Sequence, residues 1–486
     1  MSAGGQYLRR LLDTRAGRDT GVPDAARVPD RPPGRVAVIV AVAGGGGMRT
    51  PLMISGLIER RARLAVERVV LYDTDPDALH LVKTLADALL VRSGRPFTVQ
   101  TTTSPAGAFD GASFVITSVR VGGLAGRIID EQVPLAYGVV GQETTGPGGW
   151  AMALRTIPVL TDLVARVRRR APEAWVINFT NPAGLITQAL TASGETRVVG
   201  ICDSPPALGR KIAAQLRVPE SAVRLDYLGL NHLGWVRAVW TDGADRLPEI
   251  LSSDDAIRAI YGRPLFEPGE VRRLGLLPNE YLQYYYHHDE VVGRLRATPR
   301  TRAEDVADVA ARLKTSVLEA ITRGEDPLPA YEAAIFARRS SYMATETGQR
   351  RDLAMMGGHV EGGYARAALD VIEAMLHPQS RELIVNTVNQ GAIADLDDAD
   401  VVEVPSRVGP DGPDPRSMGG LPVAVRDLVL RVKAYERATV AAALHRSWRE
   451  AVAALALHPL VPSPEVGERI AGEYRRRHGP SLAYLA

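Results

Sequence analysis

The stretch that decides the fold runs from Val36 to Gly47 and reads Val-Ala-Val-Ile-Val-Ala-Val-Ala-Gly-Gly-Gly-Gly. Its continuous run of β-branched residues and alanines is typical of a strand that is buried on both faces of a parallel sheet. A helix is expected from about Pro51, directly after the glycines. Glycines between a buried strand and a helix start let the backbone approach a diphosphate, whose charge the helix N-terminus stabilises. The stretch departs from the Gly-x-Gly-x-x-Gly pattern, so its context has to support the interpretation.

A second apolar run supplies that context. Arg68-Val69-Val70-Leu71-Tyr72 ends in an acid a little over twenty residues after the glycines, where a carboxylate binds the ribose hydroxyls of NAD. An ordinary turn at the end of a strand is the alternative, but strand, glycines, helix, strand and acid follow in the order of a dinucleotide fold. The residues expected to contact NAD are Gly44, Gly45, Gly46, Gly47 and Asp73.

The alternation of strands and helices continues along the chain. Residues 114–117, 175–178 and 198–201 have the composition of buried strands, and residues 150–170 have helical periodicity. Such alternation predicts a doubly wound parallel sheet of the Rossmann type. Ligands bind beyond the carboxyl ends of the strands in these sheets. Polar residues at these ends are therefore candidates for function, namely Arg120, Asn181, Cys202 and Asp203.

The second half of the chain has a looser pattern. Helices are expected at about 302–323 and 362–376, and two long ones between 421 and 457, with occasional strands. This predicts a mainly helical α+β domain like the C-terminal domain of lactate and malate dehydrogenases, closing over the cofactor cleft. The expected division is a disordered or arm-like extension at 1–34, an NAD-binding Rossmann domain at 35–204, and a substrate and metal domain at 205–486.

Composition narrows the class of protein. The chain has 486 residues, which suggests two domains, and a net charge of +2 with no basic stripe. It has no apolar window long enough for a membrane span and no signal-peptide core at its N-terminus. Its single cysteine cannot form an internal disulfide. We therefore expect a cytoplasmic protein that binds neither nucleic acid nor membranes.

That cysteine begins the segment Ile201 to His232, which opens Ile-Cys-Asp-Ser-Pro and closes Gly-Leu-Asn-His-Leu-Gly-Trp. A thiolate and an imidazole thirty residues apart suit one divalent metal, although a lone cysteine after an apolar run is more often a small buried residue. The spacing leaves both interpretations open.

Several motifs together resemble glycoside hydrolase family 4, the NAD- and manganese-dependent 6-phospho-glycosidases and their relatives. The resemblance covers about residues 35 to 465, and the motifs occur in the order of that family. They are Arg127-Ile128-Ile129-Asp130-Glu131, Gly141-Gln142-Glu143-Thr144-Thr145-Gly146-Pro147-Gly148-Gly149, Asn181-Pro182-Ala183-Gly184, Cys202-Asp203, Gly229-Leu230-Asn231-His232 and Tyr281-Leu282-Gln283-Tyr284-Tyr285.

The resemblance implies hydrolysis by redox and elimination rather than by two carboxylates. The sugar is oxidised at carbon 3 with NAD, a base removes the acidified proton at carbon 2, and the leaving group departs from carbon 1. Water addition and re-reduction follow, so NAD is regenerated. A divalent manganese ion that bridges the oxygens on carbons 2 and 3 stabilises the enediolate.

The resemblance also implies the role of each residue. Tyr281 is expected to be the base, with its pKa lowered by the metal, and Tyr284 and Tyr285 are the alternatives. Asp203 is expected to protonate the leaving group, although a helix cap is the alternative. Glu143 is expected to tune the tyrosine. The expected metal ligands are Cys202 and His232, and the expected substrate-binding residues are Arg127, Asn181, Asn231 and Arg302.

Two features leave the substrate open. Gly47 stands where family members commonly have serine, which weakens the expectation of a phosphorylated sugar, although Arg49 is placed to compensate. Asp203 resembles α-acting members, whereas the Gly-Leu-Asn-His-Leu-Gly-Trp segment resembles β-acting ones. We expect a 6-phospho-glucosidase, β favoured, forming a homodimer or homotetramer. The alternatives are an α-specific 6-phospho-glucosidase, an α-galactosidase or a uronidase, and, from other classes, a metal-independent 2-hydroxy-acid dehydrogenase or a non-catalytic nucleotide sensor.

Overall fold

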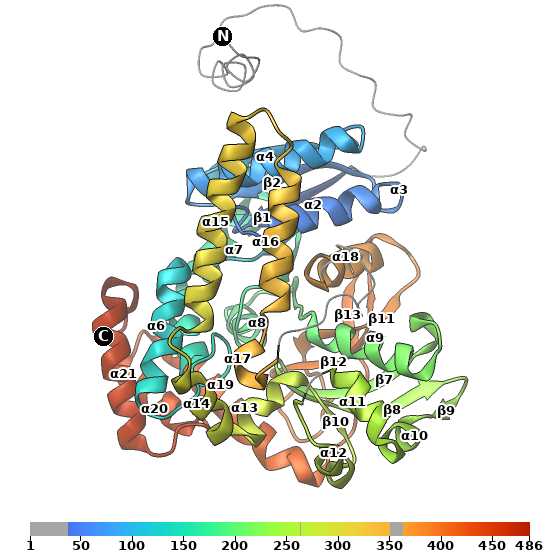
Figure 1. Ribbon diagram of the computed structural model, residues 1–486, viewed down its shortest axis with the longest axis vertical. Helices are drawn as coiled ribbons and strands as arrows, with labels where there is room; N and C mark the ends of the chain where they lie inside the picture. The colour runs from blue at the N-terminus through green and yellow to red at the C-terminus, as the bar shows by residue number, and fades with distance from the viewer. Residues whose placement is uncertain (1–36, 263, 350–362) are drawn as a thin grey trace, which may run out of the picture.

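The computed structural model describes residues 37–262, 264–349 and 363–486. The extension predicted at 1–34 lies outside the described residues, as does Val36. The protein has a large sheet with helices on both faces and a smaller sheet beside it (Figure 1). The Rossmann-type doubly wound sheet predicted from the sequence is confirmed.

The large sheet has nine strands in the order β13-β12-β11-β6-β5-β4-β1-β2-β3. The six strands from β3 to β6 run parallel in the order 3-2-1-4-5-6, which is that of a dinucleotide-binding fold. Its topological switch point lies between β1 and β4, where a ligand crevice opens. The strands are β1 (Val38–Ala43), β2 (Val66–Tyr72), β3 (Thr98–Thr102), β4 (Phe114–Thr117), β5 (Trp175–Asn178), β6 (Val198–Gly200), β11 (Arg381–Val388), β12 (Val401–Gly409) and β13 (Gly412–Pro415).

The last three strands come from the second half of the chain. β11 pairs antiparallel with β6 through Asn386 and Gly200, and β12 and β13 continue the sheet antiparallel. The sequence did not assign these strands to the first sheet, because pairing between segments so far apart leaves no local pattern. The large sheet therefore runs across the predicted boundary at residue 204, and the division into two domains stays a prediction.

Side chains of β1 alternate between two cores, one on each face of the sheet. Ala41 and Ala43 belong to one core, whereas Val40 and Val42 belong to the other. Helices α7 (Pro147–Arg170), α8 (Ala183–Ala192) and α19 (Val423–His445) contribute to the alanine side, and α2 (Thr50–Glu59), α4 (Pro76–Arg92) and α18 (Gly363–Leu376) contribute to the valine side.

The predicted helices at 150–170, 302–323 and 362–376 are confirmed as α7, α15 and α18, apart from residue 362, which lies outside the described residues. Of the two long helices predicted between 421 and 457, α19 has 23 residues but α20 only 10. The other helices are α3 (Arg61–Leu64), α5 (Pro105–Ala108), α6 (Gly123–Ala136), α9 (Ser204–Leu216), α10 (Leu247–Ser252), α11 (Asp254–Tyr261), α12 (Pro268–Leu274), α13 (Gln283–Tyr286), α14 (His288–Ala297), α15 (Arg302–Thr322), α16 (Leu328–Ser340), α17 (Ala344–Thr347), α20 (Trp448–Leu457) and α21 (Pro464–His478).

The smaller sheet presents one tight hairpin. Its strands are β7 (Arg224–Leu230), β8 (Leu233–Thr241), β9 (Ala244–Asp245) and β10 (Leu277–Pro278), all antiparallel. β7 and β8 are joined by only two residues, Asn231 and His232. A short 3-10 turn, Glu280–Leu282, follows β10 and carries Tyr281.

The long helices α15 and α16 form an antiparallel pair that reaches from the second half of the chain to the first (yellow in Figure 1). Lys314 on α15 forms an ion pair with Asp77 on α4, with 3.2 Å between Nζ and Oδ2. The Tyr331 hydroxyl on α16 donates to the carbonyl oxygen of Met48 at 3.0 Å. This helix pair therefore covers the end of the glycine turn.

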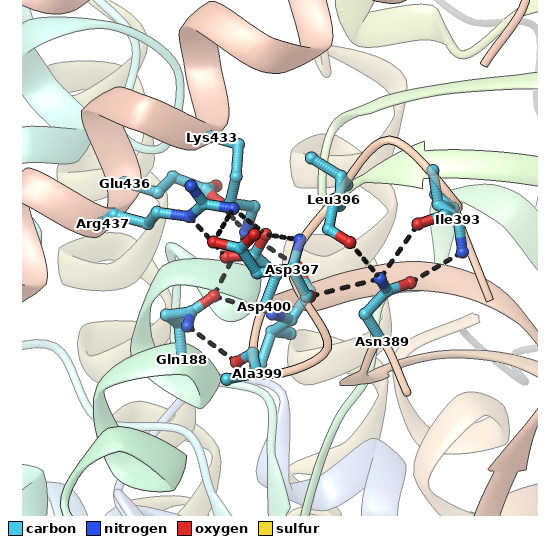
Figure 2. A network of polar contacts seen from close by, with 11 residues as sticks. Gln188, Asn389, Ile393, Leu396, Asp397, Ala399, Asp400, Lys433, Glu436 and Arg437 are labelled. Atoms are coloured by element: carbon cyan, nitrogen blue, oxygen red, sulfur yellow. Dashed lines mark hydrogen bonds and ion pairs between the residues drawn. The ribbon is translucent and has the colours of Figure 1, made fainter. Parts of the chain in front are cut away.

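A buried polar network holds α19 against α8 and the loop before β12 (Figure 2). The ammonium group of Lys433, which is 1% exposed, donates to the carbonyl oxygen of Val401 at 2.7 Å. It also lies 3.3 Å from Oε1 of Gln188 and pairs with Glu436. Because each buried charge has partners, this connection between α19 and the sheet is satisfied. None of the described helices has the length and apolarity to cross a bilayer.

Candidate active site

Gly44 and Gly45, the first two glycines of the turn after β1, are packed so closely that side chains cannot be added there. A Cβ atom on Gly44, whose φ is 87°, would lie 2.3 Å from the carbonyl oxygen of Ser118. A Cβ on Gly45 would lie 2.8 Å from Cβ of Leu71. Both amides donate to the carbonyl oxygen of Tyr72 at 2.9 Å. These contacts hold the turn directly beyond the carboxyl end of β1, at the switch point of the sheet.

Asp73 lies beside this turn, as expected from the sequence. Its Oδ2 accepts a hydrogen bond of 2.9 Å from the amide of Gly46, and its Oδ1 accepts one of 3.2 Å from Asp75. Gly47 differs from the other glycines, because a Cβ there would be 3.3 Å from the Gly44 carbonyl oxygen and 3.8 Å from the Thr50 hydroxyl. The missing serine is therefore not a consequence of crowding.

Cys202 and Asp203 follow β6 at the same edge of the sheet. Cys202 is 5% exposed, and its Sγ lies 3.5 Å from the amide of Ser204. Burial raises the pKa of Cys202 well above its usual value, and Glu403 and Asp203 add to this. Asp203 occupies the N-cap position of α9 but its side chain makes no capping hydrogen bond. The helix-cap interpretation of Asp203 is therefore wrong, and its carboxylate is left for another role.

His232 lies in the two-residue turn of the β7–β8 hairpin. Its φ is 62°, in the left-handed region that residues with side chains rarely adopt. The side chain is 5% exposed, and Nδ1 has no hydrogen-bond partner among the described residues. Burial lowers the pKa of His232 to about 3 despite the neighbouring carboxylates of Glu143 and Glu280. The imidazole is therefore neutral near pH 7, the form that binds a metal.

These two side chains fit a divalent metal. A buried thiol and a neutral imidazole with an unpaired nitrogen are suitable ligands, and the thiol loses its proton when a metal binds. No group of three or more His, Cys, Asp or Glu side chains in the described part of the chain is arranged to hold a metal. A metal held by Cys202 and His232 would therefore keep coordination positions open for substrate oxygens.

Tyr281 lies against the imidazole of His232. Its ring stacks on that of His232 with 3.4 Å between centroids and 8° between planes. Its hydroxyl forms a short hydrogen bond with the hydroxyl of Tyr342. Burial raises the pKa of Tyr281 well above its usual value, and the nearby Tyr342 and Cys202 add to this. A base at this position therefore requires a cation to stabilise its phenolate.

The other two tyrosines of the cluster face elsewhere. The Tyr284 hydroxyl donates to Oε1 of Glu346 at 2.9 Å, and the ring is fully buried. Tyr285 stacks on His458 with 6.1 Å between centroids. Tyr281 alone of the three has a ring contact with His232 among the described residues, which supports its selection over its neighbours.

A pocket beside the stack is lined by charged residues of the predicted set. Nη1 of Arg127 lies 3.1 Å from Oε2 of Glu143, and Nε lies 2.7 Å from Oε1 of Glu131. Arg120 forms a short ion pair with Glu143. Although burial opposes ionisation, Arg120 and Arg127 hold the pKa of Glu143 well below its usual range. The arrangement is a buried charge network.

Glu143 is fixed by its neighbours in the loop before α7. The side chain of Gln142 accepts hydrogen bonds from the amides of Thr144 and Thr145, both at 2.6 Å. A Cβ on Gly149 would lie 1.8 Å from the carbonyl oxygen of Thr144. The glycines of this motif therefore let α7 begin directly against the loop that carries Glu143.

Arg302 lines the pocket and contacts an arginine that the sequence did not identify. Arg302 donates to the Ser341 hydroxyl at 2.7 Å and to the carbonyl oxygen of Arg338 at 2.8 Å. Burial lowers the pKa of Arg338 well below its usual value, and the charges of Arg49 and Arg127 add to this. Cations gathered in this way are stabilised by an anion.

The two predicted asparagines have different surroundings. Asn181 is half-buried in the turn after β5, which buried Asn178 holds by donating to the carbonyl oxygen of Ala183 at 3.1 Å. Asn231 donates from Nδ2 to Oε1 of Glu403 at 3.1 Å. Oδ1 of Asn231 is buried without a partner among the described residues.

Four residues at the site were not predicted. Tyr342 and Arg338 lie near the end of α16, where no pattern separates them from a solvated helix end. Glu403 had a signal, because an acid inside the apolar run Val401 to Val404 must be buried and needs partners. The fourth residue is Asn279, which connects several side chains beneath the site.

Comparison with known families agrees with this geometry. Residues 39–218 match the family described as "Family 4 glycosyl hydrolase", and residues 227–461 match "Family 4 glycosyl hydrolase C-terminal domain". The chain is 32% identical over 454 residues to a probable 6-phospho-beta-glucosidase of Bacillus subtilis, covering 92% of this chain and 97% of the relative. It is 31% identical over 460 residues to the 6-phospho-beta-glucosidase of Escherichia coli, covering 92% and 96%.

Solved structures resemble most of the chain. One is a 6-phospho-alpha-glucosidase from gut microorganisms in complex with NAD and Mn2+, with a TM-score of 0.78 and 26% identity, covering 92% of this chain and 99% of the other. Another is the 6-phospho-beta glucosidase of Thermotoga maritima with NAD and glucose-6-phosphate, with a TM-score of 0.76 and 29% identity, covering 91% and 98%. The resemblance inferred from the motifs is confirmed, and the chain belongs to family 4 of the glycosyl hydrolases.

Proposed function

We propose that this chain hydrolyses 6-phospho-glucosides, with β-linked substrates favoured, and uses NAD and a divalent manganese ion. The observation that carries the proposal is the stack of Tyr281 on the neutral imidazole of His232, which supports a pairing of base and metal ligand. The β preference is supported by the relatives from Bacillus subtilis and Escherichia coli, which are named as 6-phospho-beta-glucosidases.

When bound, NAD supplies reversible hydride exchange at sugar carbon 3, and manganese stabilises negative charge on the oxygens of carbons 2 and 3. The glycine turn and Asp73 hold the cofactor, and Cys202 and His232 hold the metal. Tyr281 removes the proton from carbon 2. Asp203, which is free of a capping role, donates a proton to the leaving group. Glu143 orders Arg120 and Arg127 beside the imidazole, and its tuning of the tyrosine stays a prediction.

A phosphorylated substrate is supported by the group of arginines around Arg338. Arg338 lies near Arg49, Arg127 and Arg302, and among the groups that dominate its electrostatics Glu143 is the one carboxylate. A phosphate dianion would be stabilised by this group of arginines, because guanidinium groups form paired hydrogen bonds with phosphate oxygens. Asn181 and Asn231 are proposed to bind the sugar hydroxyls. An α-linked substrate remains the second candidate, and the Asp203 identity favours it.

We further propose that residues 35–204 form an NAD-binding domain and that residues 205–486 form a substrate and metal domain, to whose site the first domain contributes Cys202, Arg127 and Asn181. We also propose that the protein works in the cytoplasm as a homodimer or homotetramer. Activity in a reducing compartment is compatible with a single buried cysteine that forms no disulfide.

The test is an assay of dialysed enzyme with NAD and manganese omitted in turn. The substrate panel contains α- and β-linked 6-phospho-glucosides, uronides and unphosphorylated glucosides and galactosides. We expect cleavage of 6-phospho-glucosides only when NAD and manganese are both present. Full activity after chelation in enzyme stripped of NAD would contradict the proposal, and net oxidation of a 2-hydroxy acid would move the chain to the dehydrogenase class.

A further inference from the structure

Glu403 is a carboxylate at the centre of a buried polar network beneath the site. It lies on β12 and is 0% exposed. Oε1 accepts hydrogen bonds from Nδ2 of Asn231 at 3.1 Å and from Nδ2 of Asn386 at 3.0 Å. Oε2 accepts one from the Tyr227 hydroxyl at 3.0 Å. Three donors from three separate strands or turns therefore meet on one side chain.

One branch of the network contacts the turn that carries His232. Because Asn231 donates its amide N–H to Glu403, its Oδ1 must point the other way, and that oxygen is buried without a partner among the described residues. Asn231 and His232 are the whole turn between β7 and β8, so fixing the asparagine restrains the neighbouring imidazole.

The other branch reaches the turn that carries Tyr281. The Tyr227 hydroxyl accepts a hydrogen bond of 3.1 Å from Nδ2 of Asn279. Oδ1 of Asn279 accepts hydrogen bonds from the amide of Tyr281 and from the Ser204 hydroxyl, both at 3.1 Å. Ser204 in turn offers its amide to Sγ of Cys202. The network thus touches the loops of both expected metal ligands and of the expected base.

The surrounding backbone leaves room for this network at specific glycines. A Cβ on Gly234 would lie 2.3 Å from the Tyr227 hydroxyl, and one on Gly184 would lie 2.9 Å from Cβ of Asn231. A carboxylate placed among the valines of β12 is costly to bury, and apolar residues of similar volume would fill such a position at less cost in stability. General stability therefore gives no reason for this arrangement, whereas a requirement for fixed geometry does.

We infer that Glu403 is a positioning residue of the active site, which fixes the turn of His232 relative to the turn of Tyr281 through Asn231, Tyr227 and Asn279. The inference rests on the proposed function for the roles of His232 and Tyr281. Residues behind metal ligands fix the orientation of those ligands, and their loss changes metal affinity or activity by about 10- to 100-fold.

Two substitutions separate this role from burial alone. In Glu403→Gln an N–H group replaces the oxygen that accepts from Tyr227, so the Tyr227 hydroxyl must turn away and the branch to Asn279 loosens. In Tyr227→Phe the ring stays packed while the connection between Glu403 and Asn279 is removed. Glu373→Gln is the matched control. Glu373 is also a buried carboxylate, but it lies on α18 and pairs with Arg60 and Arg63 instead of with the network of Glu403.

The experiment measures three quantities for each variant. The first is the dissociation constant of Mn2+, by electron paramagnetic resonance. The second is kcat and KM on a 6-phospho-glucoside with NAD present. The third is hydrogen exchange of the amides in residues 227–236 and 279–284 of the metal-free protein. For Glu403→Gln and Tyr227→Phe we expect a Mn2+ dissociation constant about tenfold higher, kcat about tenfold lower with a smaller change in KM, and faster exchange in both segments.

Parental Mn2+ affinity, kcat and exchange in both network variants would overturn the inference, and so would equal losses in Glu373→Gln. If Glu403→Gln does not fold, Tyr227→Phe decides the question, because it leaves the carboxylate in place. If the parent binds Mn2+ but cleaves no 6-phospho-glucoside, the proposed function fails, whereas Mn2+ affinity and hydrogen exchange still decide whether Glu403 positions the two turns.

Discussion

The ring of His232 stacks on the ring of Tyr281, with 3.4 Å between their centroids and 8° between their planes. Residues far apart in the sequence thus place an imidazole that is neutral near pH 7 and a phenol face to face. A metal ion on the imidazole brings positive charge next to the phenol, which favours the phenolate. The contact explains how a tyrosine with a raised pKa can become a base when the metal is bound.

Replacing Tyr281 by Phe should remove the base and keep the stack. We expect NAD binding, Mn2+ binding and folding to persist, and turnover to fall by about a hundredfold or more, as is usual when a general base is lost. The measurement is exchange of the carbon 2 hydrogen with deuterated water in the product.

Tyr285→Phe is the matched control, since this ring contacts His458 instead of His232. Parental exchange in Tyr281→Phe combined with loss of exchange in Tyr284→Phe or Tyr285→Phe would move the role to that neighbour.

Replacing Cys202 by Ser should weaken metal binding. A serine hydroxyl stays protonated where a thiol binds as thiolate, and the pocket accepts the similar volume. We expect a Mn2+ dissociation constant at least about tenfold higher, measured by titration of the dialysed protein. Unchanged manganese dependence would return Cys202 to a packing role.

Gly47 and Gly45 should respond in opposite ways to added side chains. In Gly47→Ser the Cβ would lie 3.3 Å from its nearest neighbour, the Gly44 carbonyl oxygen, so we expect the variant to fold and to bind NAD as the parent does. Gly45→Ala places Cβ 2.8 Å from Leu71, so we expect weaker NAD binding and a lower melting temperature. NAD titration by fluorescence and thermal unfolding test both expectations, and equal behaviour of the two variants would contradict them.

Arg338 should contribute to recognition of the substrate anion. For Arg338→Gln we expect KM on a 6-phospho-glucoside to rise by about tenfold or more, as for loss of a hydrogen bond to a charged group. The unphosphorylated glucoside should be affected less. Arg312→Gln, on the exposed face of α15, is the control. Equal effects of Arg338→Gln on both substrates would argue against a phosphate contact.

His458 should make the fold sensitive to acid. Burial lowers its pKa to about 3, whereas an unfolded chain has a histidine pKa of about 6.5. Between these values the unfolded chain binds a proton that the folded protein does not. Stability from this group is therefore complete above about pH 6.5 and is lost as the pH falls, by roughly 1.4 kcal/mol per pH unit.

In His458→Gln the free energy of unfolding should depend less on pH by that amount, because glutamine can accept the hydrogen bond from the Leu460 amide but cannot titrate. Urea unfolding between about pH 6 and about pH 5 measures the slope. The exposed His445 provides the control substitution, and an unchanged slope in His458→Gln would exclude this histidine as the cause.

Local pattern was sufficient for much of the fold. The strands 114–117 and 175–178 were predicted at their observed bounds, because short apolar runs between polar segments have one stable place in a parallel sheet. The addition of β11 to the edge of β6 was not predicted, because it depends on contacts between residues about 190 positions apart. The motifs identified the glycine turn, Cys202, His232 and Tyr281. Arg338 and Tyr342 were not identified, because they come close to the site only through the way α16 packs in the folded protein.

The left-handed backbone of His232 has a consequence for engineering. Glycine, asparagine or aspartate adopts a φ of 62° at less cost than histidine, so the backbone alone opposes the residue that the proposed metal site needs. Selection for heat resistance and selection for turnover therefore act in opposite directions at this one position. A library screened for thermostability alone will tend to discard the imidazole, and a counter-screen for Mn2+ retention is needed to preserve it.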